Sequence, residues 1–415
     1  MEKNINCVKE KKACCSCGIC AGICPQEAIS MEIDEKTGAS LPHIHKNQCV
    51  DCGICLRICP GYYNAETVLG DTPSGHKERQ CKHLQSYIGN ISDPALLQNC
   101  TSGGIVSELI RTLLSNSIYD SAFIVNTNCY SDVVETERIT KYTPSSSKSR
   151  YIAVSHAQTA KYILAHQEER IVIVAVGCAI TGFKRMIEQY HLNRNNYLLI
   201  GLFCDKIVTY TIWNYFAGKY AAHDKLYGMD SRNKKNSGWP GDMLLYLNNR
   251  EINIDRKYRQ QVHHFFSNER CLYCTDKLNE SADISVGDNY TNINATENGT
   301  SSIIVRTPAG ELALEQIRNK CILTLIPINE IYESQSMQKK QRNFYNAKLK
   351  YQGILHAKMP CKDFLRYIKA MLRIKIGYSY PKMPWLIYLA LKLENTVQYL
   401  NSTCRLMHKS NNRHN

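Results

Sequence analysis

Long apolar runs are missing from this sequence of 415 residues. A membrane-spanning helix needs roughly 20 apolar residues in succession, and the longest candidate near the C-terminal end, Trp385 to Leu391, is far too short. No apolar run follows the first charged residues, so no secretory signal peptide is expected. The G-x-G-x-x-G fingerprint of a standard dinucleotide fold is also absent. These absences favour a cytoplasmic protein without a membrane span.

Acidic residues are the minority among the charged ones. There are 37 Asp and Glu against 51 Lys and Arg, which gives a formal net charge of +14. Such a surface suits an acidic partner, a phosphate-bearing cofactor or nucleic acid, although a solvated basic surface explains it equally well. The sequence has no recognised nucleic-acid-binding module and no interleaving of aromatic and basic residues, so a nucleic-acid partner is not expected.

Cysteine, by contrast, is abundant, with 20 in the chain. Disulfide frameworks belong mostly to small secreted proteins. A chain of this length without an expected signal peptide fits a reducing compartment better. The cysteines are therefore expected to bind metal as thiolates.

Two cysteine runs near the N-terminus repeat each other, the second one 35 residues after the first. Both match the C-x2-C-x2-C-x3-C-P pattern of bacterial 4Fe-4S proteins, in which the fourth cysteine serves the other cluster. Zinc sites usually take their ligands in two pairs, which fits poorly. Cys15 adjoins a ligand position but is out of phase, so it is interpreted as a bystander. The predicted ligands are Cys14, Cys17, Cys20 and Cys59 for one 4Fe-4S cluster, and Cys49, Cys52, Cys55 and Cys24 for the second.

The composition and the hydrophobic pattern of the sequence change after these runs. A polar segment rich in Gly, Pro and Lys is followed by alternating strand-like and helix-like segments, which is typical of an α/β domain. The predicted fold is an α+β ferredoxin-like domain, then an α/β domain with a mixed or parallel sheet, then a helical extension. The predicted boundaries are 1–62 for the two-cluster domain, 63–85 for a linker, 86–330 for the α/β domain and 331–415 for the basic, mostly helical extension.

Further cysteines stand at the ends of predicted strands. Cys178 follows the strand predicted at 171–176, and Cys204 ends the strand predicted at 198–204. Because carboxyl ends of parallel strands meet at one edge, these two cysteines can face a shared site. With the C-x2-C pair Cys271 and Cys274 they are predicted to hold a third 4Fe-4S cluster. Cys100 is a reserve ligand, most readily in place of Cys204, and burial in an apolar core is the alternative for all of them.

The segment Ser102-Gly103-Gly104 precedes a predicted helix at 105–114. The start of a helix presents unpaired amides that can bind a phosphate. A plain serine cap explains the same residues.

Taken in order, several segments resemble the beta subunit family of coenzyme F420 hydrogenase/dehydrogenase. The family usually has Gly-Thr-Pro before the cysteine that corresponds to Cys178, where this chain has Ala175-Val176-Gly177. The resemblance implies FAD beside an iron–sulfur cluster, and the flavin phosphates are then expected near Ser102, Gly103 and Gly104. The matching segments are Ser102–Gly104, Ser149–Tyr151, Gly177–Lys184, Gly201–Cys204, Cys271–Cys274, Ala282–Asp288 and Ser302–Thr307.

The resemblance implies an iron–sulfur flavoprotein oxidoreductase. The flavin would exchange hydride with an organic cofactor or substrate, coenzyme F420 or another, and single electrons would pass through the clusters. A redox partner protein or partner subunits are expected, and the residues that carry out catalysis are not identified. The alternative is a non-enzymatic electron-transfer subunit of a larger complex, which would contain clusters without flavin.

Overall fold

The computed structural model describes residues 3–62, 83–221, 223–351 and 360–397. The predicted linker at 63–85 lies mostly outside these ranges, and its last residue, Gln85, begins a strand. No helix within the described ranges is long and apolar enough to cross a membrane.

The N-terminal module is small and built around its cysteines. Its secondary structure comprises α1 (Asn6–Glu10), α2 (Ile19–Gly22), β1 (Ile29–Ile33), β2 (Ser40–Ile44) and α3 (Ile54–Ile58). The strands β1 and β2 form an antiparallel hairpin. Gly18 and Gly53 precede α2 and α3 with φ of 71° and 72°. Only glycine adopts this conformation readily, and here it lets each cysteine loop turn sharply into a short helix.

A mixed sheet forms the centre of the remaining chain. Eight strands of the described residues pair in the order β15-β3-β14-β13-β9-β8-β4-β6. The strands β13, β9, β8 and β4 run parallel, and β14 and β6 run antiparallel to their neighbours. The bounds are β3 (Gln85–Ile91), β4 (Ser121–Ile124), β6 (Glu137–Ile139), β8 (Ile171–Val176), β9 (Tyr197–Leu202), β13 (Ile284–Asp288), β14 (Ser301–Val305) and β15 (Cys321–Leu325). The predicted mixed sheet is therefore confirmed.

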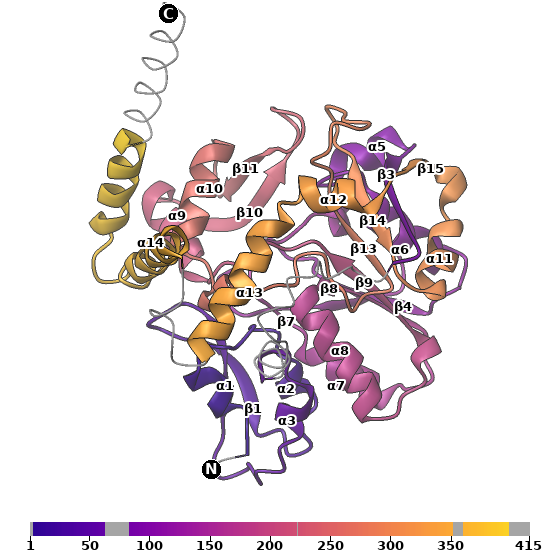
Figure 1. Cartoon of the computed structure of the whole chain (residues 1–415), viewed down its shortest axis with the longest axis horizontal. Coiled ribbons are helices and arrows are strands. Elements are labelled where there is room, and N and C mark those ends of the chain that lie inside the picture. Colours follow the sequence, from indigo (N-terminus) through magenta and orange to yellow (C-terminus); the bar gives the residue numbers. More distant parts are fainter. Residues whose placement is uncertain (1–2, 63–82, 222, 352–359, 398–415) are drawn as a thin grey trace, which may run out of the picture.

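Helices cover both faces of this sheet (Figure 1). On one face, α5 (Pro94–Asn99), α6 (Ile105–Ser115) and α11 (Pro308–Glu315) pack on strand residues such as Val172 and Ile303. On the other, α7 (Ala157–Ala165) and α8 (Gly177–Gln189) share a core with the opposite side chains of the same strands. The strand β8 buries side chains on both faces, which explains its unbroken apolar run.

A second, antiparallel sheet lies between β9 and β13 in the sequence. It was not predicted. It comprises β10 (Leu226–Asn233), β11 (Asp242–Leu247) and β12 (Glu251–Ile254), flanked by α9 (Thr211–Tyr220) and α10 (Arg256–Phe265). These elements have an aromatic core of their own that includes Tyr215, Phe216 and Phe265. Short segments complete this half of the chain: β5 (Val134–Glu135), β7 (Val154–Ser155), η1 (Pro144–Ser147), η2 (Arg194–Asn196), η3 (Glu269–Tyr273) and η4 (Arg318–Lys320).

The C-terminal extension is helical, as predicted. It contains α12 (Ile328–Ser334), α13 (Met337–Tyr351), α14 (Cys361–Tyr378) and a further helix over residues 385–397. In Figure 1, α13 runs from the sheet domain toward the N-terminal module. Its Lys340 is 6% exposed, so this helix belongs to the packed body of the protein.

Candidate functional site

The first predicted set of thiols lies together in the N-terminal module. Cys20 is buried, and its pKa is well above the usual value because of burial and the neighbouring thiols of Cys17, Cys14 and Cys59. Burial likewise raises the pKa of Cys14 to about 12. Four such thiols lose their protons together only when cationic charge is bound among them, which fits a metal centre. The backbone amide of Ser16 also donates to the sulfur of Cys14 at 3.4 Å, a contact common around cluster ligands.

The second predicted set surrounds a shared cavity. Cys24, Cys49, Cys52 and Cys55 all line it, together with Gly53. Cys55 is buried, whereas Cys52 is exposed to solvent. The structure therefore groups the eight cysteines as the crossed rule for ferredoxins requires, with the fourth cysteine of each run beside the other set.

The N-terminal module is firmly docked on the sheet domain. The amide of His156 donates to the carbonyl of Cys17 at 2.8 Å, and Asn268 Nδ2 donates to Ser16 Oγ at 3.1 Å. In Figure 1 the module lies beside α7 and α8. A Cβ on Gly22 would approach the carbonyl oxygen of Ala157 to 2.1 Å, so the helices α2 and α7 touch through backbone.

The third predicted set gathers at the carboxyl edge of the sheet. Cys178 follows β8 and Cys204 follows β9, and these strands are parallel neighbours. The pKa of Cys204 is raised mainly by burial and further by Cys271 and Cys274, so the C-x2-C pair lies next to it. Cys178 in turn neighbours Cys204. The four predicted thiols thus face one region, which the strand-end argument anticipated.

Backbone contacts fix the loop that carries this pair. The amide of Ile207 donates to Cys271 Sγ at 3.4 Å, and the amide of Cys204 donates to the carbonyl of Lys277 at 2.9 Å. A Cβ on Gly177 would lie 2.6 Å from Asp276 Oδ2, which leaves no room for a side chain there. Because residue 177 is a glycine without a side chain, the loop after Cys274 packs directly against the start of α8.

A lysine from the C-terminal extension neighbours the third set. Lys340 Nζ donates to the carbonyl of Asp205 at 2.7 Å, and its charge interacts favourably with Cys274, Cys204 and Cys271. Buried thiolates need positive charge nearby, and Lys340 supplies some of it. Within the described ranges, no three His, Cys, Asp or Glu side chains are close enough to hold a single metal ion. A four-iron cube takes its thiolates from a wider ring than a single ion does.

The structure places the reserve ligand Cys100 in an apolar core, and its role as a ligand stays a prediction. Its sulfur is 3.4 Å from Ser107 Oγ in the core between α5 and α6. Burial among apolar side chains explains this cysteine.

The predicted phosphate loop is at the same sheet edge, but its amides are only partly available. The amide of Gly103 donates to Ser301 Oγ at 3.0 Å, and Ser102 Oγ donates to the carbonyl of Thr300 at 2.8 Å. Gly104 has φ of 80° and packs against Ile91. The loop is therefore anchored to β14, and the Gly103 amide is not available to a phosphate.

Buried cations lie next to this loop. Lys234 Nζ donates to the carbonyls of Leu97, Ser102 and Asn298, and burial lowers its pKa to about 8. Arg232 pairs with Asp288 at the end of β13 and donates to the hydroxyl of Tyr151 at 3.1 Å.

A second guanidinium stands beside the first. Arg259 is 6% exposed, lies over the Tyr151 ring at 6.0 Å and has its pKa lowered by burial. Nη2 of Arg232 and Nε of Arg259 have no hydrogen-bond partner among the described residues. Unpaired buried donors are costly, and an anion at this place would pair them.

The sequence analysis missed these arginines. Both belong to the inserted β10–α10 region, and no motif marks them. The one available signal was the cluster of basic residues from Arg232 to Lys235 at the end of an apolar strand pattern.

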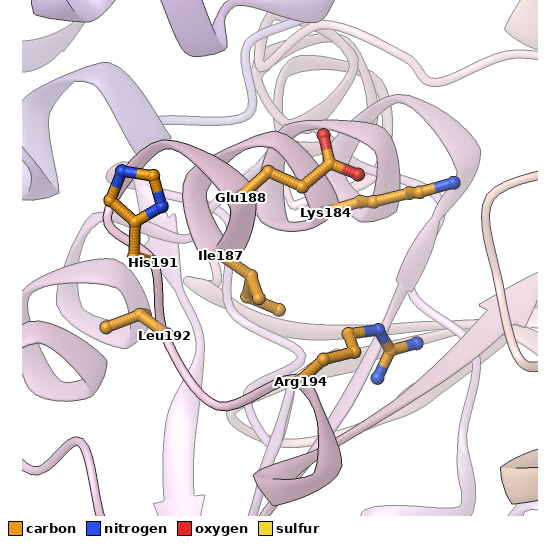
Figure 2. Close-up of a pocket in the computed structure, with 6 residues that line it drawn as sticks. All are labelled: Lys184, Ile187, Glu188, His191, Leu192 and Arg194. Carbon is orange, nitrogen blue, oxygen red and sulfur yellow. The ribbon is translucent and has the colours of Figure 1, made fainter.

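A separate surface cavity of about 470 Å³ lies along α8 (Figure 2). Arg194 reaches into it while its guanidinium is held by Asp283 at 2.7 Å. None of the predicted site residues lines this cavity. Its lining is Lys184, Ile187, Glu188, His191, Leu192 and Arg194.

Fold and thiol sets together define an iron–sulfur redox protein. Residues 13–62 match the 4Fe-4S dicluster domain, and residues 168–331 match the family described as the C terminus of the coenzyme F420 hydrogenase/dehydrogenase beta subunit. The resemblance expected from the sequence is thereby confirmed.

Two individual proteins are similar to the chain. The coenzyme F420-dependent sulfite reductase of Methanocaldococcus jannaschii is 25% identical over 326 residues, which cover 75% of this chain and 47% of the relative. The chain thus spans about half the length of the curated relative that it matches. A chain of the F420-reducing [NiFe] hydrogenase complex of Methanosarcina barkeri aligns with a TM-score of 0.47 and 15% identity, over 66% of this chain and 91% of that chain.

Proposed function

We propose that this protein is an iron–sulfur flavoprotein oxidoreductase. The observation that carries the proposal is the placement of the thiols. One predicted set gathers at the carboxyl edge of the sheet, and the N-terminal module docks so that Cys17 lies near Cys178. The three sets then form a continuous series from the exposed Cys52 to the interior of the sheet domain.

Each set would hold one 4Fe-4S cluster. Cys14, Cys17, Cys20 and Cys59 would bind the first, and the cavity-lining Cys24, Cys49, Cys52 and Cys55 the second. Cys178, Cys204, Cys271 and Cys274 would bind the third, with Lys340 offsetting part of its negative charge. The dicluster match supports the first two, and the shared position of four thiols at one edge of the sheet supports the third.

The buried arginines are the best place for the phosphates of FAD. Arg232 and Arg259 have donors without partners, and both are more than nine-tenths buried. Lys234 donates to the carbonyl of Ser102, so the neighbouring loop is fixed in position beside the arginines. This refines the expectation for Ser102, Gly103 and Gly104: the loop would form a wall of the site, and the arginines would bind the phosphates. When bound, a flavin can accept a hydride and release electrons singly.

The substrate class follows from the resemblance and remains part of the proposal. The sulfite reductase relative is named for its dependence on coenzyme F420. We therefore propose a small organic hydride donor or acceptor of that kind at the sheet edge. Cys52 and the other exposed parts of the second set would face a redox partner protein or partner subunit.

Anaerobic purification of the full chain with iron, sulfide and flavin assays tests the proposal. We expect about twelve iron atoms per chain, from three cubes of four, and about one flavin. About eight iron atoms with flavin would remove the third cluster from the proposal. Clusters without any flavin would favour the electron-transfer subunit instead.

A further inference from the structure

The helix over residues 385–397 is apolar on two opposite faces. Ile387 and Leu391 are 0% and 5% exposed, and they belong to the aromatic core of the inserted β10–α10 region. These two side chains attach the helix to the body of the protein, next to α14 in Figure 1. Residues two positions apart on a helix point in nearly opposite directions. The opposite face accordingly carries a second apolar stripe, which is between 47% and 58% exposed: Trp385, Leu389, Leu393 and Val397.

Polar contacts hold this exposed stripe in a fixed orientation. Glu394 accepts a hydrogen bond from Arg373 of α14 at 2.7 Å, and Asn395 accepts one from Gln261 of α10 at 2.7 Å. The helix therefore cannot rotate to bury its second face. The stripe extends about 18 Å along the helix. Single apolar side chains are normal on a surface, whereas a continuous apolar row on an anchored helix indicates a binding surface.

The surroundings of the stripe are basic. Residues 360–397 contain seven Lys and Arg but only two Asp and Glu. Both carboxylates, Asp363 and Glu394, pair with arginines of α14, at 3.3 Å and 2.7 Å. The apolar stripe thus lies within a field of positive charge, which complements a negatively charged surface. The exposed lysines of this segment are Lys362, Lys369, Lys375, Lys382 and Lys392.

The composition of this surface favours a lipid layer over an acidic protein. Helices that lie in a membrane interface combine Trp and Leu side chains with Lys and Arg. The exposed rings of Trp385 and Tyr388 suit the headgroup level, which is apolar on one side and hydrated on the other. Lysine stems lie along apolar surface while their ammonium groups reach phosphates. The stripe is on the outer face of a helix, to which lipid headgroups adapt, whereas a protein partner would need a matching groove.

We propose that the C-terminal extension binds this protein peripherally to membranes that contain anionic lipids. Trp385, Leu389 and Leu393 insert among the headgroups, and the exposed lysines contact the lipid phosphates. Apolar insertion and basic charge together give reversible binding that needs no membrane-spanning segment. This property goes beyond the proposed redox function and does not depend on any of the thiol sets.

Co-sedimentation of the full chain with lipid vesicles tests the proposal. We expect binding to vesicles that contain phosphatidylglycerol, much weaker binding to pure phosphatidylcholine vesicles, and release by salt, which screens the lysines. Leu389→Gln combined with Leu393→Gln should weaken binding by at least about tenfold, because two apolar contacts are lost. Lys392→Gln should weaken it about fivefold. Leu312→Gln is the matched control and should bind like the wild type, because Leu312 is an exposed leucine on a different helix, α11.

Three outcomes would overturn the inference. The first is a wild-type chain that does not bind the phosphatidylglycerol vesicles, and the second is unchanged binding in the double leucine variant. The third is a wild-type dimer that the double variant converts to a monomer, because a second copy of the chain would then cover the stripe. Iron content and the midpoint of unfolding should be the same in all variants, which shows that they fold. Failure of vesicle binding would leave the iron and flavin assays of the proposed function unaffected.

Discussion

The thiols of the N-terminal module and those of the sheet domain are assembled in different ways. In the module, all eight lie between Cys14 and Cys59, and two short loops place them. In the sheet domain, the strand β9 and the whole β10–α10 insertion separate Cys178 from Cys274 in the sequence. A local set forms when its loop folds, whereas a distributed set forms only when the sheet is complete. The two should therefore respond differently to damage.

The largest effect should come from removing one thiol from each kind of set. Cys274→Ser should lose about four iron atoms and leave the signals of the module unchanged, because the eight predicted ligands of the module do not depend on this loop. Cys17→Ser is the counterpart in the first set and should lose a different cluster of the same size. Iron assays and electron paramagnetic resonance on both variants check this. If either variant lost the signals of both regions, the two regions would not be independent.

A smaller effect is expected from the buried arginines. Arg259→Gln removes a charged donor from the proposed phosphate site, and hydrogen bonds to charged groups are worth about 1.5 to 3 kcal/mol. The flavin dissociation constant should therefore rise about 10- to 100-fold, as measured by fluorescence titration of the deflavinated protein.

Arg256→Gln is the matched control, because Arg256 lies one turn earlier on α10 and is only half-buried. Equal affinities in both variants would place the phosphates elsewhere. Iron content should stay at the wild-type value in each.

The smallest effect concerns the contact between the two regions. Gly22→Ala would push a methyl group into the carbonyl oxygen of Ala157, which a Cβ would approach to 2.1 Å. Overpacking of this kind costs about 1 to 3 kcal/mol, so anaerobic denaturation should show a less stable protein. Gly218→Ala in α9 is the control, since the new methyl would meet only the Tyr380 hydroxyl, at 2.9 Å. Equal loss of stability in the two variants would mean that the docking contact is not tight.

The difference between the local and the distributed thiol sets also explains which features could be predicted from the sequence. In the runs around Cys14 and Cys49, the spacing of the cysteines determines which thiols lie together. The two groups of four were therefore predicted from the sequence alone. Cys178 and Cys204 were found because parallel strands end at one edge, an argument that needs only strand assignments. The match over residues 168–331 supports the resemblance on which the third set also rests.

Other features depend on contacts that no spacing reveals. Cys15 was interpreted as a bystander because its phase within the run says nothing about Cys178, which the docking of the module brings beside it. Cys100 was predicted as a reserve ligand because it adjoins the glycine loop, yet its side chain turns into the core between α5 and α6. Arg232 and Arg259 come from the β10–α10 insertion, Arg232 from β10 and Arg259 from α10, and no motif marks either of them.

The exposure of Cys52 has a consequence for the order in which dioxygen oxidises the three thiol sets. The other predicted ligands are buried or half-buried, so dioxygen meets the second set first. Thiolates and clusters that solvent reaches oxidise sooner than buried ones. Brief exposure should therefore release iron in steps, beginning at the surface. The order in which the signals disappear would then measure how deeply each set lies in the molecule.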